Sequence, residues 1–213
     1  MVFSIKKLIF FTAFLAFFVV TSQVFASTYT VNDPTDTDAD NGLCSIVEAI
    51  LNDNGGGTTG SVDCTAGDFV QPGVFNITTD ITLDTVYETT DAPNALPTNG
   101  ASVTMNGNGN TISRDPGAGE FRIFRFIGLY DFIINDLTIS GGDINSELDE
   151  GGAGLYVSSA TSVTLNNVTF DDNHAYDGGA LHVDTDSSPQ IDLNIIDSFF
   201  TNNTAVNDGG AAL

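Results

Sequence analysis

The chain has 213 residues, with 28 acidic side chains against five basic ones, so its formal net charge is −23. Asp, Asn and Gly number 23, 19 and 22, about 30% of the chain, and these residues form turns and are poor helix formers. This composition excludes a helical bundle, and the negative charge argues against binding to nucleic acid, whose phosphates would be repelled. The apolar fraction of 41% is large enough for a hydrophobic core.

Residues 1–26 have the pattern of a secretory signal peptide. Lys6 and Lys7 precede an apolar run at residues 8–20, and small residues at positions 24 and 26 suit cleavage after Ala26. The alternative, an uncleaved membrane anchor, is disfavoured because a spanning helix needs about 20 apolar residues. The sequence therefore predicts an exported protein without membrane insertion in its mature part.

The exported part carries a net charge of −25, because both lysines leave with the signal peptide. A surface of this kind suits divalent cations or a salty medium. Cys44 and Cys64 both lie in this part, where thiols are usually oxidised. We expect them to form a disulfide worth about 3 kcal/mol. Two free thiols are the alternative, and zinc is not expected because no His lies nearby.

Residues 27–68 are interpreted as an N-terminal cap with a short strand at 28–31, an Asp-rich turn and a short helix. Ser45 and Glu48 form a capping box that places the helix start at Ser45, and residues 52–57 end it. The apolar positions follow helical spacing: Leu43, Ile46, Val47, Ile50 and Leu51.

Residues 69–135 alternate short β-prone runs with turns. The expected strands lie at 74–78, 81–83, 101–105, 111–113 and 121–126, and residues 106–110 (Asn-Gly-Asn-Gly-Asn) form a tight turn. In the run 121–126 the aromatic residues do not alternate, so we expect burial on one side and a turn on the other.

From residue 136 onward the chain repeats itself. Gly-Gly-Ala recurs at residues 151, 178 and 209, and a Phe-x-x-Asn pattern recurs at 170 and 200. A period near 30 residues indicates a solenoid. Each unit is too small for a propeller blade of four strands, but it fits one coil of a parallel β-helix. We therefore predict an all-β parallel β-helix over residues 69–213.

This architecture predicts which residues stack on successive coils. Asn173 and Asn203 are expected to form an Asn ladder, and Tyr156 and His182 to point outward from adjacent coils. The short helix would cover an end of the solenoid, where unpaired strands are otherwise exposed. The residues expected to point inward and stack are Leu155, Val157, Leu181, Val183 and Leu213, together with Phe170 and Phe200.

Two local patterns resemble known families. Residues 31–40, followed by Cys44-Ser45-Ile46-Val47-Glu48-Ala49-Ile50, resemble the CSLREA domain of exported bacterial proteins, with Val47 where the motif has Arg. The Gly-Gly-Ala and Phe-x-x-Asn repeats are similar to those of polymorphic outer-membrane proteins. This resemblance implies a right-handed parallel β-helix at the cell surface or secreted, adhesin-like or carried as an autotransporter passenger. It implies no reaction.

The Asp-rich turn is the candidate metal site. Asp36, Asp38 and Asp40 approach the spacing of a calcium loop, but Gly42 and Glu48 each come one place later than an EF-hand requires. The carboxylates could hold calcium in another geometry; the alternative is a solvated Asp turn. No other cofactor is expected.

Right-handed β-helices also include pectate lyases and polygalacturonases, so an enzyme is the alternative. Asp171 and Asp172 are the adjacent acidic pair of the repeat region, yet neighbours on a strand face opposite ways unless they lie at a turn. The Asn-Thr-Asp, Gly-His-Gly and Arg-Ile-Lys motifs of polygalacturonases are missing. We expect Arg122 and Arg125 to cap strand ends or to pair with Asp. His174 and His182 lack a nearby Ser or Cys nucleophile and are expected to decorate the surface.

The leading hypothesis is a non-enzymatic, exported β-helix module, secreted or at the cell surface or outer membrane, with an extracellular protein or glycan as its partner and no catalytic residues. The alternative is a polysaccharide-binding or polysaccharide-degrading β-helix. Several convergent carboxylates and an Arg in a cleft would favour an enzyme, whereas a smooth face of Thr, Ser, Asn and scattered Asp would favour a binding module. The chain stops within a repeat, which predicts a fragment of a longer β-helix.

Overall fold

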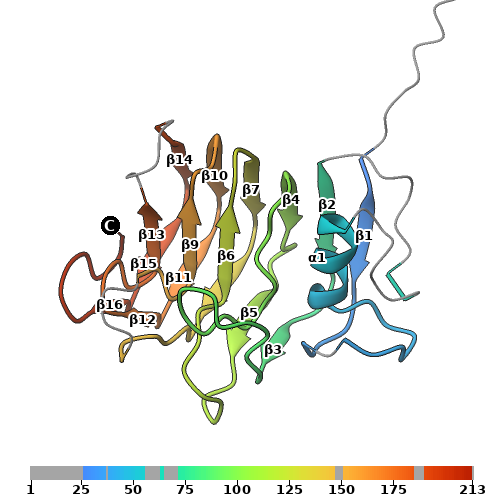
Figure 1. The fold of residues 1–213 in the computed structure, drawn as a ribbon, viewed down its shortest axis with the longest axis horizontal. Coiled ribbons are helices and arrows are strands. Elements are labelled where there is room, and N and C mark those ends of the chain that lie inside the picture. Colours follow the sequence, from blue (N-terminus) through green and yellow to red (C-terminus); the bar gives the residue numbers. More distant parts are fainter. Residues whose placement is uncertain are drawn as a thin grey trace, which may run out of the picture.

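The computed structural model describes residues 26–36, 38–55, 63–64, 72–146, 151–184 and 190–212. These residues form sixteen strands and one helix. Each pair of neighbouring strands is parallel, and the strands of successive coils stack side by side along the long axis of the molecule (Figure 1). The predicted all-β parallel β-helix is confirmed.

Three sheets form the faces of the solenoid, and a small fourth sheet lies at a corner. The first sheet runs β1 (Thr28–Val31), β2 (Gly73–Ile77), β4 (Val103–Asn106), β7 (Asp131–Asn135), β10 (Ser162–Asn166) and β14 (Asp192–Ile196). The second runs β3 (Ile81–Leu83), β5 (Thr111–Arg114), β8 (Thr138–Ser140), β11 (Thr169–Asp171) and β15 (Phe199–Thr201). The third runs β6 (Phe124–Ile127), β9 (Leu155–Ser158) and β13 (Leu181–Asp184), and the corner sheet pairs β12 (His174–Ala175) with β16 (Thr204–Ala205).

Like residues stack on like in the core, as the repeats predict. Leu155 is the register partner of Leu181 on the neighbouring strand, and both side chains are fully buried. Phe170 and Phe200 are also register partners, with ring centroids 5.0 Å apart and an angle of 9° between the rings. The period near 30 residues therefore equals one coil. Leu213 lies outside the described residues.

The corners use residues that tolerate the left-handed backbone conformation. Asp136, Asn167 and Asp197 each follow a strand of the first sheet, with φ of 50°, 51° and 48°. Short polar side chains adopt this region more readily than others. One coil earlier Gly107 takes the corner, because a Cβ there would lie 2.4 Å from the carbonyl oxygen of Asp136. The positions of Asn, Asp and Gly in the sequence thus specify where the chain bends.

The predicted Asn ladder is present at the end of β11. The Asn173 side chain is fully buried. Its Nδ2 donates to Asn203 Oδ1 at 3.0 Å and to the Ile139 carbonyl at 3.1 Å, while its Oδ1 accepts from the Gly142 N–H at 3.0 Å. The Asn203 Nδ2 in turn donates to the Phe170 carbonyl. One side chain therefore bridges three coils.

Replacing Asn173 with Ala is expected to lower the free energy of unfolding by about 2–3 kcal/mol, because the buried Ile139 carbonyl and Gly142 N–H of the neighbouring coil lose their partner. Urea denaturation followed by circular dichroism measures the change. The matched control is Asn203→Ala, where the partly exposed side chain leaves groups that water can reach, so a smaller loss is expected. Equal losses would contradict this account of the ladder.

Helix α1 (Ile46–Asn54) has the predicted N-terminus. Ser45 is its N-cap: the Ser45 N–H donates to Glu48 Oε2 at 2.8 Å, and the Glu48 N–H donates to Ser45 Oγ at 3.1 Å. Ile46 and Ile50 join the core that also contains Phe75 of β2. Leu43 does not belong to the buried stripe, because it precedes the cap and is 39% exposed.

Helix α1 lies at the β1 end of the stack (Figure 1), where its buried face extends the core. No helix of the described segments is long and apolar enough to cross a bilayer.

The predicted disulfide between Cys44 and Cys64 is present, with the two Cα atoms 4.7 Å apart. Reduction, or the Cys64→Ala variant, is expected to lower the free energy of unfolding by about 3 kcal/mol, since the bond closes a loop of some 20 residues. Denaturation midpoints with and without reductant test this. The control is the Cys44→Ala/Cys64→Ala double variant, whose denaturation midpoint should be the same with and without reductant. An unchanged midpoint on reducing the wild type would contradict the expectation.

The expected strand at 121–126 differs from the observed one. β6 begins at Phe124, whereas Phe121 and Arg122 form isolated bridges with Asp143 and Asn94. The bend at Ile123 interrupts the alternation of inward and outward residues. Both sides of this segment are consequently buried, not one side as predicted: Phe121, Arg122, Ile123, Phe124 and Phe126 are each at most 1% exposed.

Candidate functional site

The outer face of the six-stranded first sheet is the broadest regular surface of the solenoid. Outward positions alternate with buried ones along β4, β7 and β10, and in-register pairing aligns them into columns. In one column the Asn166 Nδ2 donates to Asn135 Oδ1 at 2.8 Å, Asn135 donates to Asn106 Oδ1 at 3.0 Å, and Asn106 donates to Asn76 Oδ1 at 3.0 Å. The neighbouring column contains Thr28, Val74, Thr104, Ile133, Thr164 and Asn194. The face therefore presents fixed amides, hydroxyls and methyl groups.

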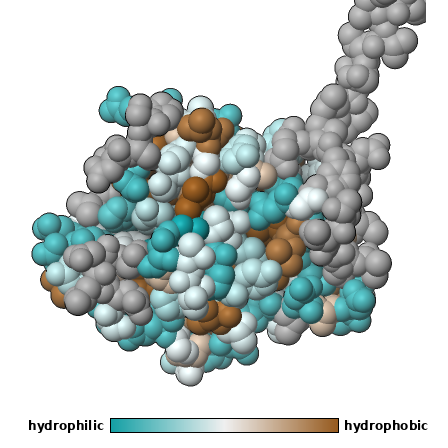
Figure 2. Space-filling view, in the orientation of Figure 1, coloured by the Kyte–Doolittle hydropathy of each residue, from teal (hydrophilic) through white to brown (hydrophobic). Residues whose placement is uncertain are grey.

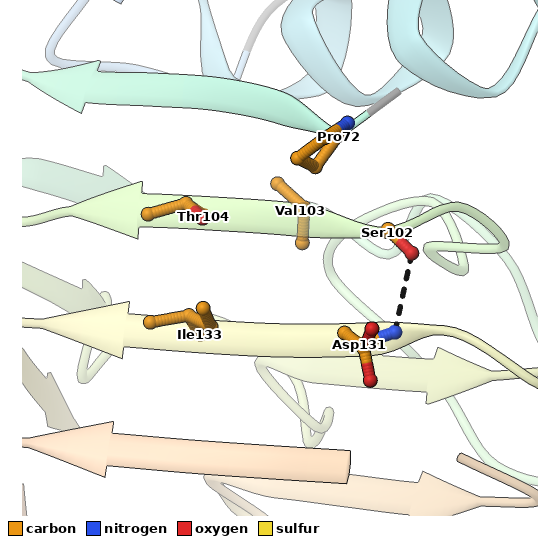
Figure 3. A pocket seen from close by; sticks show the side chains of 6 residues that line it. All are labelled: Pro72, Ser102, Val103, Thr104, Asp131 and Ile133. Atoms are coloured by element: carbon orange, nitrogen blue, oxygen red, sulfur yellow. Dashed lines mark hydrogen bonds between the residues drawn. The ribbon is translucent and has the colours of Figure 1, made fainter. Parts of the chain in front are cut away.

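A shallow groove of about 250 Å³ crosses this face where β4 and β7 begin (Figure 3). At one end the Asp131 N–H donates to Ser102 Oγ at 3.2 Å. Asp131 supplies the one carboxylate of its lining, whereas glycoside hydrolysis uses two. The groove is lined by Pro72, Ser102, Val103, Thr104, Asp131 and Ile133.

The second sheet presents a smaller array of hydroxyls. Thr111, Thr138 and Thr169 are aligned in register on its outer face. Asp171, in the adjacent column, accepts from Thr201 Oγ1 at 2.7 Å and from Asn202 Nδ2 at 2.8 Å. This carboxylate is thus bound to the neighbouring coil.

Asp172 lies at a corner, with φ of 56°, so the predicted pair of neighbouring acids falls at a turn. Its Oδ1 lies 3.1 Å from His174 Nε2, and the His174 Nδ1 lies 2.5 Å from Thr204 Oγ1 on the next coil. The sequence interpretation considered only Ser or Cys as a nucleophile and missed Thr204. The spacing of 30 residues between His174 and Thr204 equals one coil and indicates that the two residues lie side by side. Carboxylate, imidazole and hydroxyl follow the order of a nucleophilic triad. The Asp172 side chain is 64% exposed, however, and hydrolytic sites depend on a water-excluded pocket.

The third sheet carries the strongest cluster of polar and aromatic side chains. Tyr156 and His182 are register partners, with ring centroids 5.5 Å apart. The guanidinium carbon of Arg122 lies 4.7 Å from the Tyr156 ring centroid. Tyr156 Oη and Ser158 Oγ each donate to Asp184 Oδ2 at 3.2 Å. Figure 2, which faces this sheet, shows a mostly hydrophilic surface with separate hydrophobic patches.

This cluster corrects the sequence interpretation of His182. His182 is partly buried rather than a surface decoration, and its Nδ1 has no hydrogen-bond partner among the described residues. Arg122 is fully buried and donates to the carbonyls of Gly151 and Gly152. Arg125 forms an ion pair with Asp91, as expected. The Tyr156 and His182 rings are partly buried and stack on each other from adjacent coils, so the pair contributes to packing between coils.

Burial lowers the pKa of His182 below its ordinary 6.5, and Arg122 lowers it further, whereas Asp184 and Asp177 act in the opposite direction. The unfolded chain therefore binds more protons than the folded one in mild acid, and stability is expected to fall as the pH drops below about 6.5. Comparing urea midpoints at pH 7.5 and 5.5 for the wild type and His182→Gln tests this. The variant is expected to show the smaller drop, and equal drops would contradict the assignment.

The Asp-rich turn is built differently from the expected calcium loop. Asp36 is 7% exposed, and its Oδ2 accepts from the Thr85 Oγ1 at 2.8 Å and from the N–H groups of Thr85 and Asp84. Asp38 and Asp40 are exposed. In the described ranges no group of three or more His, Cys, Asp or Glu side chains could hold a metal ion. Calcium binding at Asp36, Asp38 and Asp40 stays a prediction.

Asp33, which the sequence analysis did not single out, shapes the same turn. Its carboxylate accepts from the Thr35 N–H at 2.9 Å, from Thr35 Oγ1 at 2.7 Å and from Asn41 Nδ2 at 2.7 Å. Burial acts to raise the pKa of Asp33, but these hydrogen bonds outweigh it and hold the pKa below its ordinary value. The turn is thus held by carboxylates that accept from the chain itself.

Fold and surface together define a β-solenoid with regular lateral faces. Residues 167–184, which include β11, β12 and β13, match the Chlamydia polymorphic membrane protein (Chlamydia_PMP) repeat. This finding agrees with the repeats identified in the sequence. Neither the curated proteins nor the solved structures contain a match to the chain.

Proposed function

We propose that the protein is an exported β-helix module of the bacterial surface, which binds an extracellular protein or glycan through the outer face of its first sheet. The observation that supports this most directly is the continuous column of outward Asn amides over β2, β4, β7 and β10, beside a column in which Thr hydroxyls alternate with apolar side chains. Such an array offers many weak, evenly spaced contacts to a partner. It also meets the criterion for a binding module set out from the sequence.

Two further observations support a surface location. The matched repeat belongs to a family described as membrane proteins of Chlamydia, and the N-terminus has the pattern of a signal peptide. Residues 1–25 lie outside the described residues. The resemblance of residues 31–50 to the CSLREA domain is a further proposal that agrees with export.

Binding assays on immobilised glycans and extracellular-matrix proteins test the proposal. A Thr104→Arg/Thr164→Arg variant places two bulky cations on the first sheet's outer face and is expected to weaken binding at least ten-fold. Thr138→Arg, an equivalent change on the outer face of the second sheet, is the matched control and should bind as the wild type does. Equal loss in both variants, or no binding by the wild type, would contradict the proposal.

The polysaccharide-degrading alternative has a separate test. The purified protein is incubated with polygalacturonate and calcium, and unsaturated products are followed by ultraviolet absorbance. We expect none, because the groove of Figure 3 contains a single carboxylate, Asp131, and no arginine. Product formation that disappears in an Asp131→Asn variant would establish the enzyme instead.

A further inference from the structure

One corner between the third and the first sheet is built differently from its neighbour. The links from β6 to β7 and from β9 to β10 both have three residues, 128–130 and 159–161, and their flanking strands pair in register. Ala160 takes the middle position of the second link and is fully buried, whereas its counterpart Leu129 is 63% exposed. Tyr130, which follows Leu129, is 39% exposed. This coil therefore presents an apolar and an aromatic side chain where the next coil buries an alanine.

The backbone at Gly128 accounts for the difference. Gly128 has φ of 111°, whereas Ser159 at the same position of the next coil has φ of 59°. The Tyr130 N–H donates to the Gly128 carbonyl at 2.7 Å, which closes a tight turn around Leu129. A Cβ at Gly128 would lie 2.7 Å from Cε2 of Tyr130, so glycine leaves the room that the ring needs. The turn thus holds the exposed pair in place.

The preceding coil leaves this corner uncovered as well. Asn99 and Val103 are the register partners of Phe126 and Phe132. Three residues connect the first two and five connect the second two, so residues 128–130 form a raised corner. Both neighbouring corners belong to the described residues, and the exposure of Leu129 therefore arises inside the stack. Adjacent exposed apolar side chains with a polar surround are typical of interaction sites.

The groove of Figure 3 begins directly after the raised corner. Asp131 follows Tyr130 in the chain and lines the groove, whose apolar part includes Pro72 and Ile133. Ser162 Oγ donates to Asp131 Oδ1 at 2.6 Å, which orients the carboxylate. Asp131 is exposed, so its carboxylate can also receive a cation. An apolar pair, a partly apolar groove and a carboxylate consequently adjoin one another.

The charge of the protein selects among the possible partners. Beyond residue 26 the chain has 28 acidic side chains and three basic ones. The Arg114 side chain is 14% exposed, and Arg122 and Arg125 are buried. An anionic polysaccharide is therefore repelled, whereas a cationic segment is attracted. A neutral sugar is covered with hydroxyl groups, and Leu129 and Ile133 offer these no hydrogen bond in return for lost hydration.

We propose that the raised corner and the adjoining groove bind a segment of a partner protein in which an apolar side chain lies beside an Arg or Lys. The apolar side chain packs on Leu129 and Tyr130 and enters the groove towards Ile133, while the cation pairs with Asp131. Tyrosine is a frequent anchor of this kind, because its ring supplies a large contact area at the centre of an interface. The inference rests on the proposed function and narrows its partner to a protein.

Selection of a random peptide library on the immobilised protein gives the first test. Phage that bind the Leu129→Ser/Tyr130→Ser variant are removed beforehand, so that the remaining phage depend on the raised corner. The enriched peptides are expected to carry Arg or Lys next to an apolar residue. Enrichment of acidic or uncharged peptides, or of no sequence at all, would overturn the proposal.

Single variants with matched controls give the second test. Binding of an enriched peptide, made synthetically and followed by fluorescence anisotropy, is expected to weaken by about ten-fold or more in Tyr130→Ala and in Leu129→Ser. Tyr87→Ala and Leu43→Ser remove side chains that are 44% and 39% exposed elsewhere, and they should bind as the wild type does. Circular dichroism verifies that each variant is folded. Equal losses at the raised corner and in the controls would overturn the proposal.

The role of the carboxylate has its own test. Asp131→Asn is expected to weaken binding of the same peptide several-fold and to reduce its dependence on salt, because the attraction between opposite charges is screened by ions. Asp136→Asn, at the opposite end of β7 and also exposed, is the control and should leave both quantities unchanged. An affinity and a salt dependence that are the same in Asp131→Asn and in the wild type would contradict the pairing with a cation.

The binding assays on glycans and matrix proteins separate this inference from the proposed function. If Thr104→Arg/Thr164→Arg abolishes binding of a matrix protein and Leu129→Ser/Tyr130→Ser preserves it, the proposed function holds and this inference fails. Binding of a neutral glycan that disappears in Leu129→Ser/Tyr130→Ser would overturn the choice of a protein partner. If the wild type binds nothing, the proposed function fails and this inference fails with it.

Discussion

Replacing Phe170 with Ala is expected to lower the free energy of unfolding by about 3–5 kcal/mol, the usual loss for a large aromatic side chain removed from a packed core. Phe170 is fully buried and its ring stacks on Phe200 of the next coil. Neighbouring coils also hold its backbone, so the structure has little freedom to collapse into the space. Urea denaturation monitored by circular dichroism measures the loss.

Phe200→Ala is the matched control for this prediction. Phe200 occupies the same position one coil later, but its side chain is partly exposed. The same chemical change there removes less buried area, so the loss should be smaller. If both variants lose the same stability, position along the stack does not determine the contribution of each coil.

Replacing Arg122 with Ala is expected to lower the free energy of unfolding by about 4 kcal/mol. Its guanidinium donates to the Gly151 carbonyl at 2.8 Å, to the Gly152 carbonyl at 3.2 Å and to Asn94 Oδ1 at 3.1 Å, and it lies over Tyr156. Removing these donors leaves buried acceptors unsatisfied, at about 1–3 kcal/mol each. The midpoint and slope of urea unfolding provide the measurement.

Arg122→Lys separates charge from geometry at this position. A lysine keeps the positive charge but cannot reproduce the planar fork that reaches several acceptors, so we expect it to recover only part of the lost stability. Full recovery would show that charge alone matters. A loss below about 1 kcal/mol in Arg122→Ala would contradict the structural role assigned to the guanidinium.

The solenoid was predictable because its determinants repeat. The Gly-Gly-Ala and Phe-x-x-Asn patterns return near every 30 residues, and this period places Leu155 on Leu181 and Asn173 on Asn203. The start of α1 was equally predictable, since a capping box involves two residues three positions apart. Local and periodic signals of this kind need no knowledge of the rest of the fold.

The polar interactions were less predictable. Asp36 was considered as a calcium ligand, yet its hydrogen-bond partner Thr85 lies 49 residues away. The environment of Arg122 depends on Gly151 and Asn94, which belong to neighbouring coils. A side chain of a given type can bind a metal, lie exposed on the surface or join a buried hydrogen-bond network. Which of these it does depends on the residues that surround it in the fold.

By itself, therefore, the sequence determined the class of fold, the coil length, the corners and the disulfide pair, because short-range spacing and repetition encode them. The tertiary structure alone decided which carboxylates accept from backbone N–H groups, as Asp36 does, and that Arg122 is buried among acceptors of two neighbouring coils. These properties arise from contacts between residues about 30 or more positions apart, where burial and hydrogen bonding depend on how the coils are stacked.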